Sequence, residues 1–152
     1  MATPARTASA RNVVMAALAL ASTACRPSAP YAQVDIVAHN YSFTVPATLP
    51  PGPTAFRFIN AGSVLHEAQL FRFASGISAD SARRMLASGI IPDSAAEVQG
   101  GILVGVAGDT VRQRILDDLR SGAVYGINCE FRDSTGAPQH SRLGMYAVIR
   151  VQ

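Results

Sequence analysis

Residues 125–151 read YGINCEFRDSTGAPQHSRLGMYAVIRV. Apolar residues alternate at both ends of this stretch, and its polar middle contains Gly136 and Pro138. The pattern predicts a strand, a loop and a second strand. Cys129 then ends the first strand, His140 lies in the loop, and Met145 begins the second strand. One short segment therefore carries a thiolate, an imidazole and a thioether.

These side chains form a particular kind of metal-ligand set. Thiolate and thioether favour Cu(I) and imidazole serves both oxidation states of copper, so two His and one Cys with a weak axial Met make a blue-copper site. The second imidazole must come from elsewhere. His66 is the candidate, because it follows an alternating apolar segment in NAGSVLHEAQLF. We expect one copper ion bound by His66, Cys129, His140 and Met145.

The segment YSFTVPATLPPGPTAFRFINAGSVLH, followed downstream by the Cys, a second His and a Gly-Met pair, resembles the cupredoxin (type 1 blue copper) family of plastocyanin- and azurin-like domains. The resemblance extends from Val34 to Val151. It implies that His66 is the early His ligand, Cys129 the thiolate, His140 the late His and Met145 the axial ligand. In the family, the late His is partly exposed and electrons leave through it.

One spacing departs from the family pattern. Four residues separate His140 from Met145, as is common in the family, but ten residues separate Cys129 from His140. Small cupredoxins usually have only a few residues between that Cys and that His, so the ligand loop is atypically long. Gly136 and Pro138 favour a turn that brings this loop back on itself.

Upstream of this stretch, short alternating segments are separated by turn signals. Residues 34–38 and 41–45 alternate, LPPGP marks a turn, and residues 54–60 and 65–73 alternate again. An inward-facing His66 at the start of the last segment fits a ligand position at the end of a sheet. Many short strands between Gly and Pro turns predict an all-β fold, a Greek-key β-sandwich.

Three segments interrupt the strand pattern. Residues 78–88 predict one short inserted helix, which Ser78 or Asp80 can cap and Gly89 can end. Residues 90–98 are expected to be irregular. The Gly-rich residues 100–109 lack the Lys and Ser/Thr of a phosphate-binding loop and predict a turn and an exposed connection. The pattern of residues 111–119 fits either a strand or a helix.

The N-terminal residues 1–25 have the pattern of a signal peptide. A basic start precedes an apolar run, and small residues precede Cys25. Cys25 also resembles the lipidated Cys of a bacterial lipoprotein, so lipidation and ordinary cleavage nearby both stay open. Residues 26–33 predict a short tether, and residues 34–152 the cupredoxin-like domain. We expect export to a bacterial periplasm or anchoring at the cell envelope, with membrane contact only through a lipid on Cys25.

Composition limits the classes of function. A chain of 152 residues that is 49% hydrophobic can form one domain with a core. Beyond residue 25, eleven Arg residues face ten acidic residues, and no Arg cluster is interleaved with aromatic residues. Nucleic acid is therefore not an expected partner.

The chain contains only three His residues. Larger copper enzymes need additional His clusters, and only His39 remains unassigned here, where we expect it to be exposed. The sequence thus predicts a monomeric electron carrier that serves a redox partner protein, and not an enzyme. The alternative is a cupredoxin-like module that delivers copper, or a metal-free binding module.

Two further alternatives concern the ligand residues themselves. Zinc could occupy His66, Cys129 and His140 with a water molecule, although the thioether of Met145 is a poor zinc ligand. A disulfide between Cys25 and Cys129 would instead close a metal-free domain, and it would require that Cys25 is retained.

Overall fold

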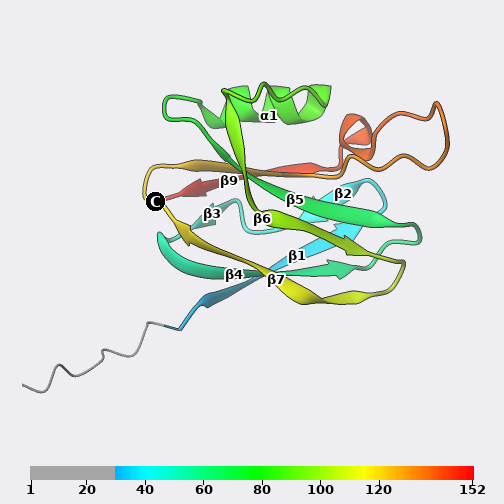
Figure 1. Ribbon diagram of the computed structural model, residues 1–152, viewed down its shortest axis with the longest axis horizontal. Coiled ribbons are helices and arrows are strands. Elements are labelled where there is room, and N and C mark those ends of the chain that lie inside the picture. Colours follow the sequence, from blue (N-terminus) through cyan, green and yellow to red (C-terminus); the bar gives the residue numbers. More distant parts are fainter. Residues whose placement is uncertain (1–29) are drawn as a thin grey trace, which may run out of the picture.

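The computed structural model describes residues 30–152. Within them the chain folds into two β-sheets packed against each other, with one short helix on the outside (Figure 1). The predicted β-sandwich with one inserted helix is confirmed. The predicted signal peptide and the first residues of the predicted tether lie outside the described residues.

The first sheet contains four strands in the order β2-β1-β4-β7. Strands β1 and β4 are parallel, and the other neighbours are antiparallel. The bounds of these strands are Ala32–His39 for β1, Ser42–Thr44 for β2, Gly52–Asn60 for β4 and Thr110–Leu119 for β7.

The second sheet contains five strands in the order β3-β9-β8-β5-β6. Because β5 and β8 are antiparallel, the start of β5 and the end of β8 lie at the same end of the sheet, with Gln69 opposite Asn128. This register brings the regions of His66 and Cys129 together. The bounds are Thr48–Leu49 for β3, His66–Phe73 for β5, Ala96–Gly105 for β6, Val124–Asn128 for β8 and Tyr146–Val151 for β9.

The main core fills the space between the two sheets. Large apolar side chains from both inner faces are fully buried there, and the candidate ligands Cys129 and Met145 belong to the same cluster. Each such side chain contributes about 1.5–3 kcal/mol when it is withdrawn from water. The site is therefore built into one end of the core. The largest apolar residues of this core are Ile36, Phe56, Phe58, Leu70, Ile115, Tyr125, Ile127 and Ile149, together with Met145.

The helix α1 (Ala79–Ser88) covers the outer face of the second sheet (Figure 1). Its buried Ala82 and Leu86 pack against Phe71 and Phe73, which form a second, smaller core. The predicted ends are confirmed: the side chain of Ser78 accepts a hydrogen bond from the first turn, and the next residue after the helix, Gly89, has φ 66°. No helix of residues 30–152 is long and apolar enough to cross a membrane.

The prediction for residues 90–109 was wrong in part. Strand β6 begins at Ala96 and continues through the Gly-rich segment to Gly105. Gly100 and Gly101 have φ of 66° and 98°, and the pairing of β5 with β6 shifts register nearby. A Cβ on Gly100 would lie 2.6 Å from Ile115, so these glycines bend an edge strand closely over β7 and do not end it.

Strand β7 resolves the ambiguity of residues 111–119. The buried positions of this strand are Val111, Ile115 and Leu119, which are four residues apart. That spacing equals two strand periods as well as about one helical turn, so the apolar residues alone fit both structures. Pairing with β4 makes the segment a strand.

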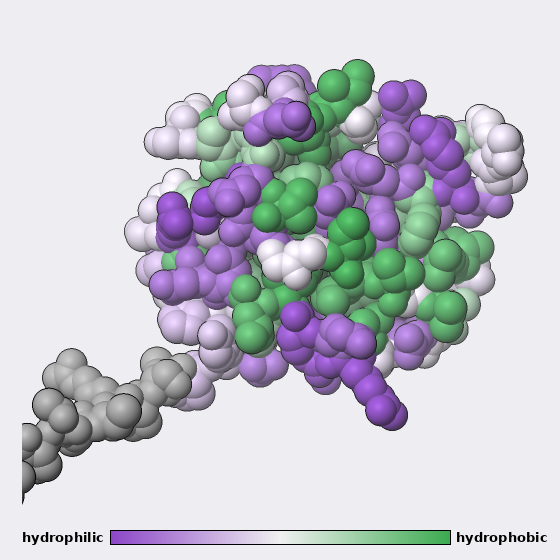
Figure 2. Space-filling model, in the orientation of Figure 1, coloured by the Kyte–Doolittle hydropathy of each residue, from purple (hydrophilic) through white to green (hydrophobic). Residues whose placement is uncertain are grey.

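Apolar residues are also exposed along the two edge strands. Figure 2 shows hydrophobic side chains gathered on the face over β6 and β7. Because each strand has a neighbour in its sheet on one side only, apolar side chains there remain in contact with water. The exposed large hydrophobic residues of this region are Val98, Ile102, Val104, Val106 and Leu116.

Candidate metal centre

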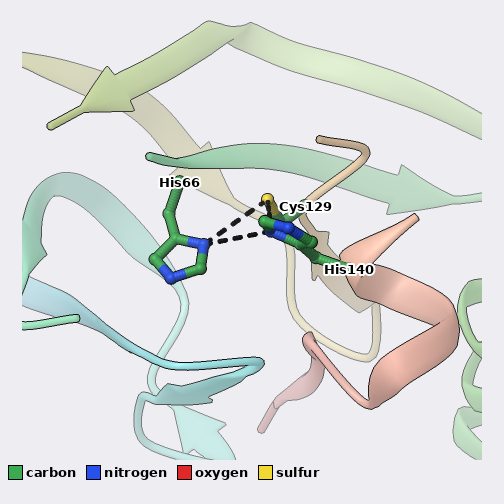
Figure 3. A group of neighbouring side chains, drawn as sticks. All are labelled: His66, Cys129 and His140. Carbon is green, nitrogen blue, oxygen red and sulfur yellow. Dashed lines mark hydrogen bonds between the residues drawn. The ribbon is translucent and has the colours of Figure 1, made fainter. Parts of the chain in front are cut away.

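Three of the predicted ligands meet at one end of the sandwich. His66 is the first residue of β5, Cys129 follows β8 directly, and His140 begins a short 3-10 helix, His140–Leu143. Figure 3 shows the two rings and the sulfur pointing toward one another from these three elements. The three residues are fully or almost fully buried, with exposures of 0%, 0% and 1%.

The distances between the donor atoms match those of a three-coordinate metal site. His66 Nδ1 lies 3.2 Å from His140 Nδ1 and 4.0 Å from Cys129 Sγ, and His140 Nδ1 lies 3.4 Å from Cys129 Sγ. A point equidistant from the three atoms is about 2.1 Å from each, close to metal–ligand bonds of roughly 2.0–2.3 Å to nitrogen and sulfur. The residues present therefore fit a trigonal metal ion.

The long loop between Cys129 and His140 does not prevent closure of the site. The backbone N–H of His140 donates to Phe131 O at 2.8 Å, and that of Ser141 donates to Cys129 O at 2.8 Å. These hydrogen bonds join the two ends of the loop, so residues 132–139 extend outward without separating the ligands. Figure 1 shows this orange segment projecting beside the sandwich.

Met145 is fully buried next to these residues. Its backbone N–H donates to His140 O at 2.9 Å, and its carbonyl accepts from Cys129 N–H at 3.2 Å. The main chain of Met145 is thus bonded to both neighbouring ligand residues. The role of its thioether as an axial ligand remains a prediction.

Asn60 is a structural residue of the site. Its side chain is buried and makes three hydrogen bonds. Its Nδ2 donates to Val64 O and Gly105 O, both at 2.8 Å, and its Oδ1 accepts from Gly62 N–H at 2.9 Å. These bonds fix the turn that leads into His66.

Glu67 connects the two strands that carry His66 and Cys129. Its backbone N–H points to Cys129 Sγ at 3.4 Å, and its carboxylate accepts from Glu130 N–H at 2.8 Å. Both contacts fasten the residues around Cys129 to the start of β5. Alternation alone could not find this role, because Glu67 lies on the opposite face of the strand from His66.

Two other residues near His140 were not predicted from the sequence. Asp133 Oδ1 lies 3.1 Å from His140 Nε2, and Tyr41 OH donates to Asp133 Oδ2 at 2.6 Å. Asp133 belongs to the long loop and Tyr41 to the turn between β1 and β2. An Asp in the ligand loop was the available signal, but nothing in the sequence links Tyr41 to it.

Burial dominates the electrostatics of the site. It raises the pKa of the Cys129 thiol to about 11, and together with the neighbouring His140 it lowers the pKa of His66. The hydrogen bond between Tyr41 and Asp133 lowers the pKa of Asp133 and raises the pKa of Tyr41. Without a metal ion the site therefore holds a protonated thiol, and binding of a metal ion must displace that proton.

His66 Nε2 is buried and has no hydrogen-bond partner among the described residues. A buried polar atom without a partner costs about 1–3 kcal/mol. His39 lies at the exposed end of β1, as expected, and does not belong to this cluster. Cys129 is not in a disulfide within residues 30–152, and the alternative partner Cys25 lies outside the described residues.

The solved structures that resemble this chain include two auracyanins. An auracyanin of Roseiflexus castenholzii aligns with TM-score 0.52 and 16% identity, over 82% of this chain and 99% of that one. Auracyanin A of Chloroflexus aurantiacus, described as a "blue" copper protein, aligns with TM-score 0.51 and 14% identity, over 81% and 100%. No protein-family model and no curated protein matches the sequence.

At such low sequence identity, the similarity between these structures and this chain establishes the fold. The chain has the cupredoxin fold, which confirms the fold that the resemblance implied. The candidate ligands His66, Cys129 and His140 are brought together at one end of its sandwich.

Proposed function

We propose that this chain is an exported type 1 copper protein that carries single electrons between partner proteins. The observation that carries the proposal is the triangle of His66 Nδ1, Cys129 Sγ and His140 Nδ1 in a cupredoxin fold. Met145 completes the proposed ligand set as the weak axial donor. Copper supplies one-electron chemistry by alternating between Cu(I) and Cu(II).

The protein would contribute a rigid and dry site. The three donors are set by β5, β8 and the hydrogen-bonded stem of the ligand loop, so they need little rearrangement when the charge of the site changes. Water is excluded because these side chains are buried in the core. Both properties favour rapid electron exchange with a docked redox partner.

Burial also favours an electron carrier over a copper-delivery protein. Delivery requires the ligands of a second protein to reach the ion, whereas His66, Cys129 and His140 are at most 1% exposed. Because the late His of this chain is covered, in contrast to the expectation from the family, electrons would pass through the residues over it. The loop 130–139 would then form part of the surface that faces the partner.

The remaining features of the proposal come from the sequence. The signal pattern of residues 1–25 supports export to a periplasm, and Cys25 supports a lipid anchor at the cell envelope. His39 is exposed and is not part of the group formed by His66, Cys129 and His140, which supports a carrier with one copper ion over a copper enzyme. We propose that the carrier acts as a monomer.

The proposal is tested by titrating the full chain, expressed with its own leader and purified without metal, with Cu(II). An intense thiolate-to-copper absorption band in the visible range is expected for the wild type and for His39→Ala, which serves as the matched His control. The band should be absent from Cys129→Ser and from His66→Ala. Tight Cu(I) binding without this band would overturn electron transfer in favour of delivery.

Two further results would also contradict the proposal. Failure to bind copper in either oxidation state, with the fold intact, would favour a metal-free binding module. Preferential binding of Zn(II) over copper in competition would favour a zinc site. For the anchor, mass spectrometry of the N-terminus of wild type and Cys25→Ser distinguishes a lipidated Cys25 from ordinary cleavage.

A further inference from the structure

The turn between β1 and β2 holds one residue in an unusual backbone conformation. Among the described residues, Tyr41 is the only residue other than Gly with positive φ, at 60°. This region of φ and ψ is uncommon for a bulky residue and is retained only where the surrounding structure requires it. We therefore expect the Tyr41 side chain to make contacts that maintain this backbone conformation.

That side chain lies over the candidate metal centre. The Tyr41 ring is edge-on to the His140 ring, with centroids 5.0 Å apart, and edge-on to the His66 ring at 6.4 Å. Its hydroxyl donates to Asp133 Oδ2 at 2.6 Å, although the two residues are 92 positions apart in the sequence. The strained turn thus brings Tyr41 into contact with both the rings and the ligand loop.

Asp133 connects Tyr41 to His140. Its second oxygen, Oδ1, lies 3.1 Å from His140 Nε2. A carboxylate can only accept hydrogen bonds, so Nε2 is the ring nitrogen that carries hydrogen in this pair. The other nitrogen, Nδ1, faces Cys129 Sγ at 3.4 Å and is left as the nitrogen able to bind a metal ion.

His66 provides an internal comparison. Its Nε2 is buried without a hydrogen-bond partner among the described residues, so no carboxylate holds the outer nitrogen of this ring. His140 differs because its outer nitrogen is capped by a carboxylate that is itself 41% exposed. The capping closes the His140 ring off from water, and the ring is only 1% exposed.

We propose that Asp133 and Tyr41 are positioning residues for His140. Asp133 selects the form of the ring that has Nδ1 directed at the metal, and Tyr41 holds Asp133 in place and covers the ring. Such carboxylate–histidine–metal arrangements raise metal affinity by orienting the ligand, and loss of the outer partner typically lowers affinity about 10–100-fold. This inference rests on the proposed copper function, but part of its test does not need copper.

The first measurement uses the metal-free full chain. Nitrogen-15 NMR of the His side chains is expected to show the Nε2–H form of His140 in the wild type and in Tyr31→Phe, a control at an exposed Tyr. Asp133→Ala should give a mixture of both forms. If His140 keeps the same single form in Asp133→Ala, the inference is overturned, whatever the protein does with copper.

The second measurement is Cu(II) affinity by competition with a chelator. Asp133→Ala is expected to lose about 10–100-fold and Tyr41→Phe less, because the Phe ring still covers His140 while only the hydrogen bond to Asp133 is lost. Asp133→Asn should restore part of the affinity, because its carbonyl oxygen still accepts from Nε2. Asp93→Ala, at an exposed Asp outside the site, should leave affinity unchanged.

The results separate this inference from the proposed function. If the wild type binds no copper but the form of His140 still depends on Asp133, the positioning role stands and the copper function fails. If copper binds with a type 1 spectrum and Asp133→Ala keeps affinity within about twofold of the wild type, the positioning role fails and the copper function stands. Thermal unfolding of each variant shows whether it is folded, and Tyr41→Phe tests the role while the carboxylate of Asp133 is kept.

Discussion

His66 Nδ1 and His140 Nδ1 lie 3.2 Å apart although 74 positions separate the two residues in the sequence. One nitrogen must donate to the other at this distance when no ion lies between them. The pair is therefore directed toward a shared point, together with the sulfur of Cys129. Two buried imidazoles that face each other in this way suit the binding of a metal ion but lower the stability of the metal-free protein. This can be tested.

Replacement of His66 by Leu should stabilise the metal-free protein by about 1–2 kcal/mol while abolishing copper binding. Leu has a similar volume, and it removes a buried ring whose Nε2 has no partner among residues 30–152. Urea unfolding of the metal-free protein measures the first effect and a copper titration the second. The matched control, His39→Leu at the exposed end of β1, should change neither; a loss of stability in His66→Leu would contradict the prediction.

Asn60→Ala should destabilise the protein by about 2–4 kcal/mol, because two carbonyls and one N–H lose their buried partner. Copper affinity should fall as well, since the turn before His66 is no longer fixed. Chemical unfolding and chelator competition give the two quantities. Asn40→Ala is the control: Asn40 accepts from Ser63 on the same turn but is exposed, so it should cost less than about 1 kcal/mol.

The stability of the metal-free protein should fall at alkaline pH because of Cys129. Burial raises the pKa of this thiol from 9.0 to about 11. Below pH 9 the thiol is protonated in both the folded and unfolded states, and its contribution is fully present. As the pH rises to about 11 the unfolded chain ionises first, which removes up to ~2–3 kcal/mol of stability.

Urea midpoints at pH 7.5 and pH 10.5 for wild type and Cys129→Ala isolate this effect. Burial raises the pKa of Tyr125 too, but Tyr125 is present in both proteins, so only their difference reports on Cys129. The wild type should lose more stability between the two pH values than the variant. Equal losses would mean that the thiol does not ionise later in the folded state.

Local patterns in the sequence predicted the sandwich and the four candidate ligand residues. Alternation marked most strands, because it depends on residues close together in the chain. The order of His, Cys, His and Met marked the ligand set through the resemblance to a known family, although 74 positions separate His66 from His140. The extent of β6 was missed because glycines were taken to end a strand, whereas Gly100 bends it over Ile115.

The missed parts of the site depend on tertiary contacts. Tyr41 and Asp133 meet only after the first and last thirds of the chain have packed together, and no local period reports such a meeting. The closure of the long ligand loop depends likewise on the backbone hydrogen bond from His140 to Phe131. The sequence shows that ten residues lie between Cys129 and His140, but it does not show that hydrogen bonds join the two ends of this loop.

The burial of all three donors also governs how fast a metal ion can enter. Since His66, Cys129 and His140 are at most 1% exposed, we expect that the structure around them must open locally before an ion can reach the donor atoms. The rate of loading is then set by this opening and not by the strength of the bonds formed afterwards. A chain that folds before it meets copper should therefore bind the ion slowly. A chain that has bound copper should release it slowly. Each form, metal-free or metal-bound, should then persist for much longer than a single electron transfer takes.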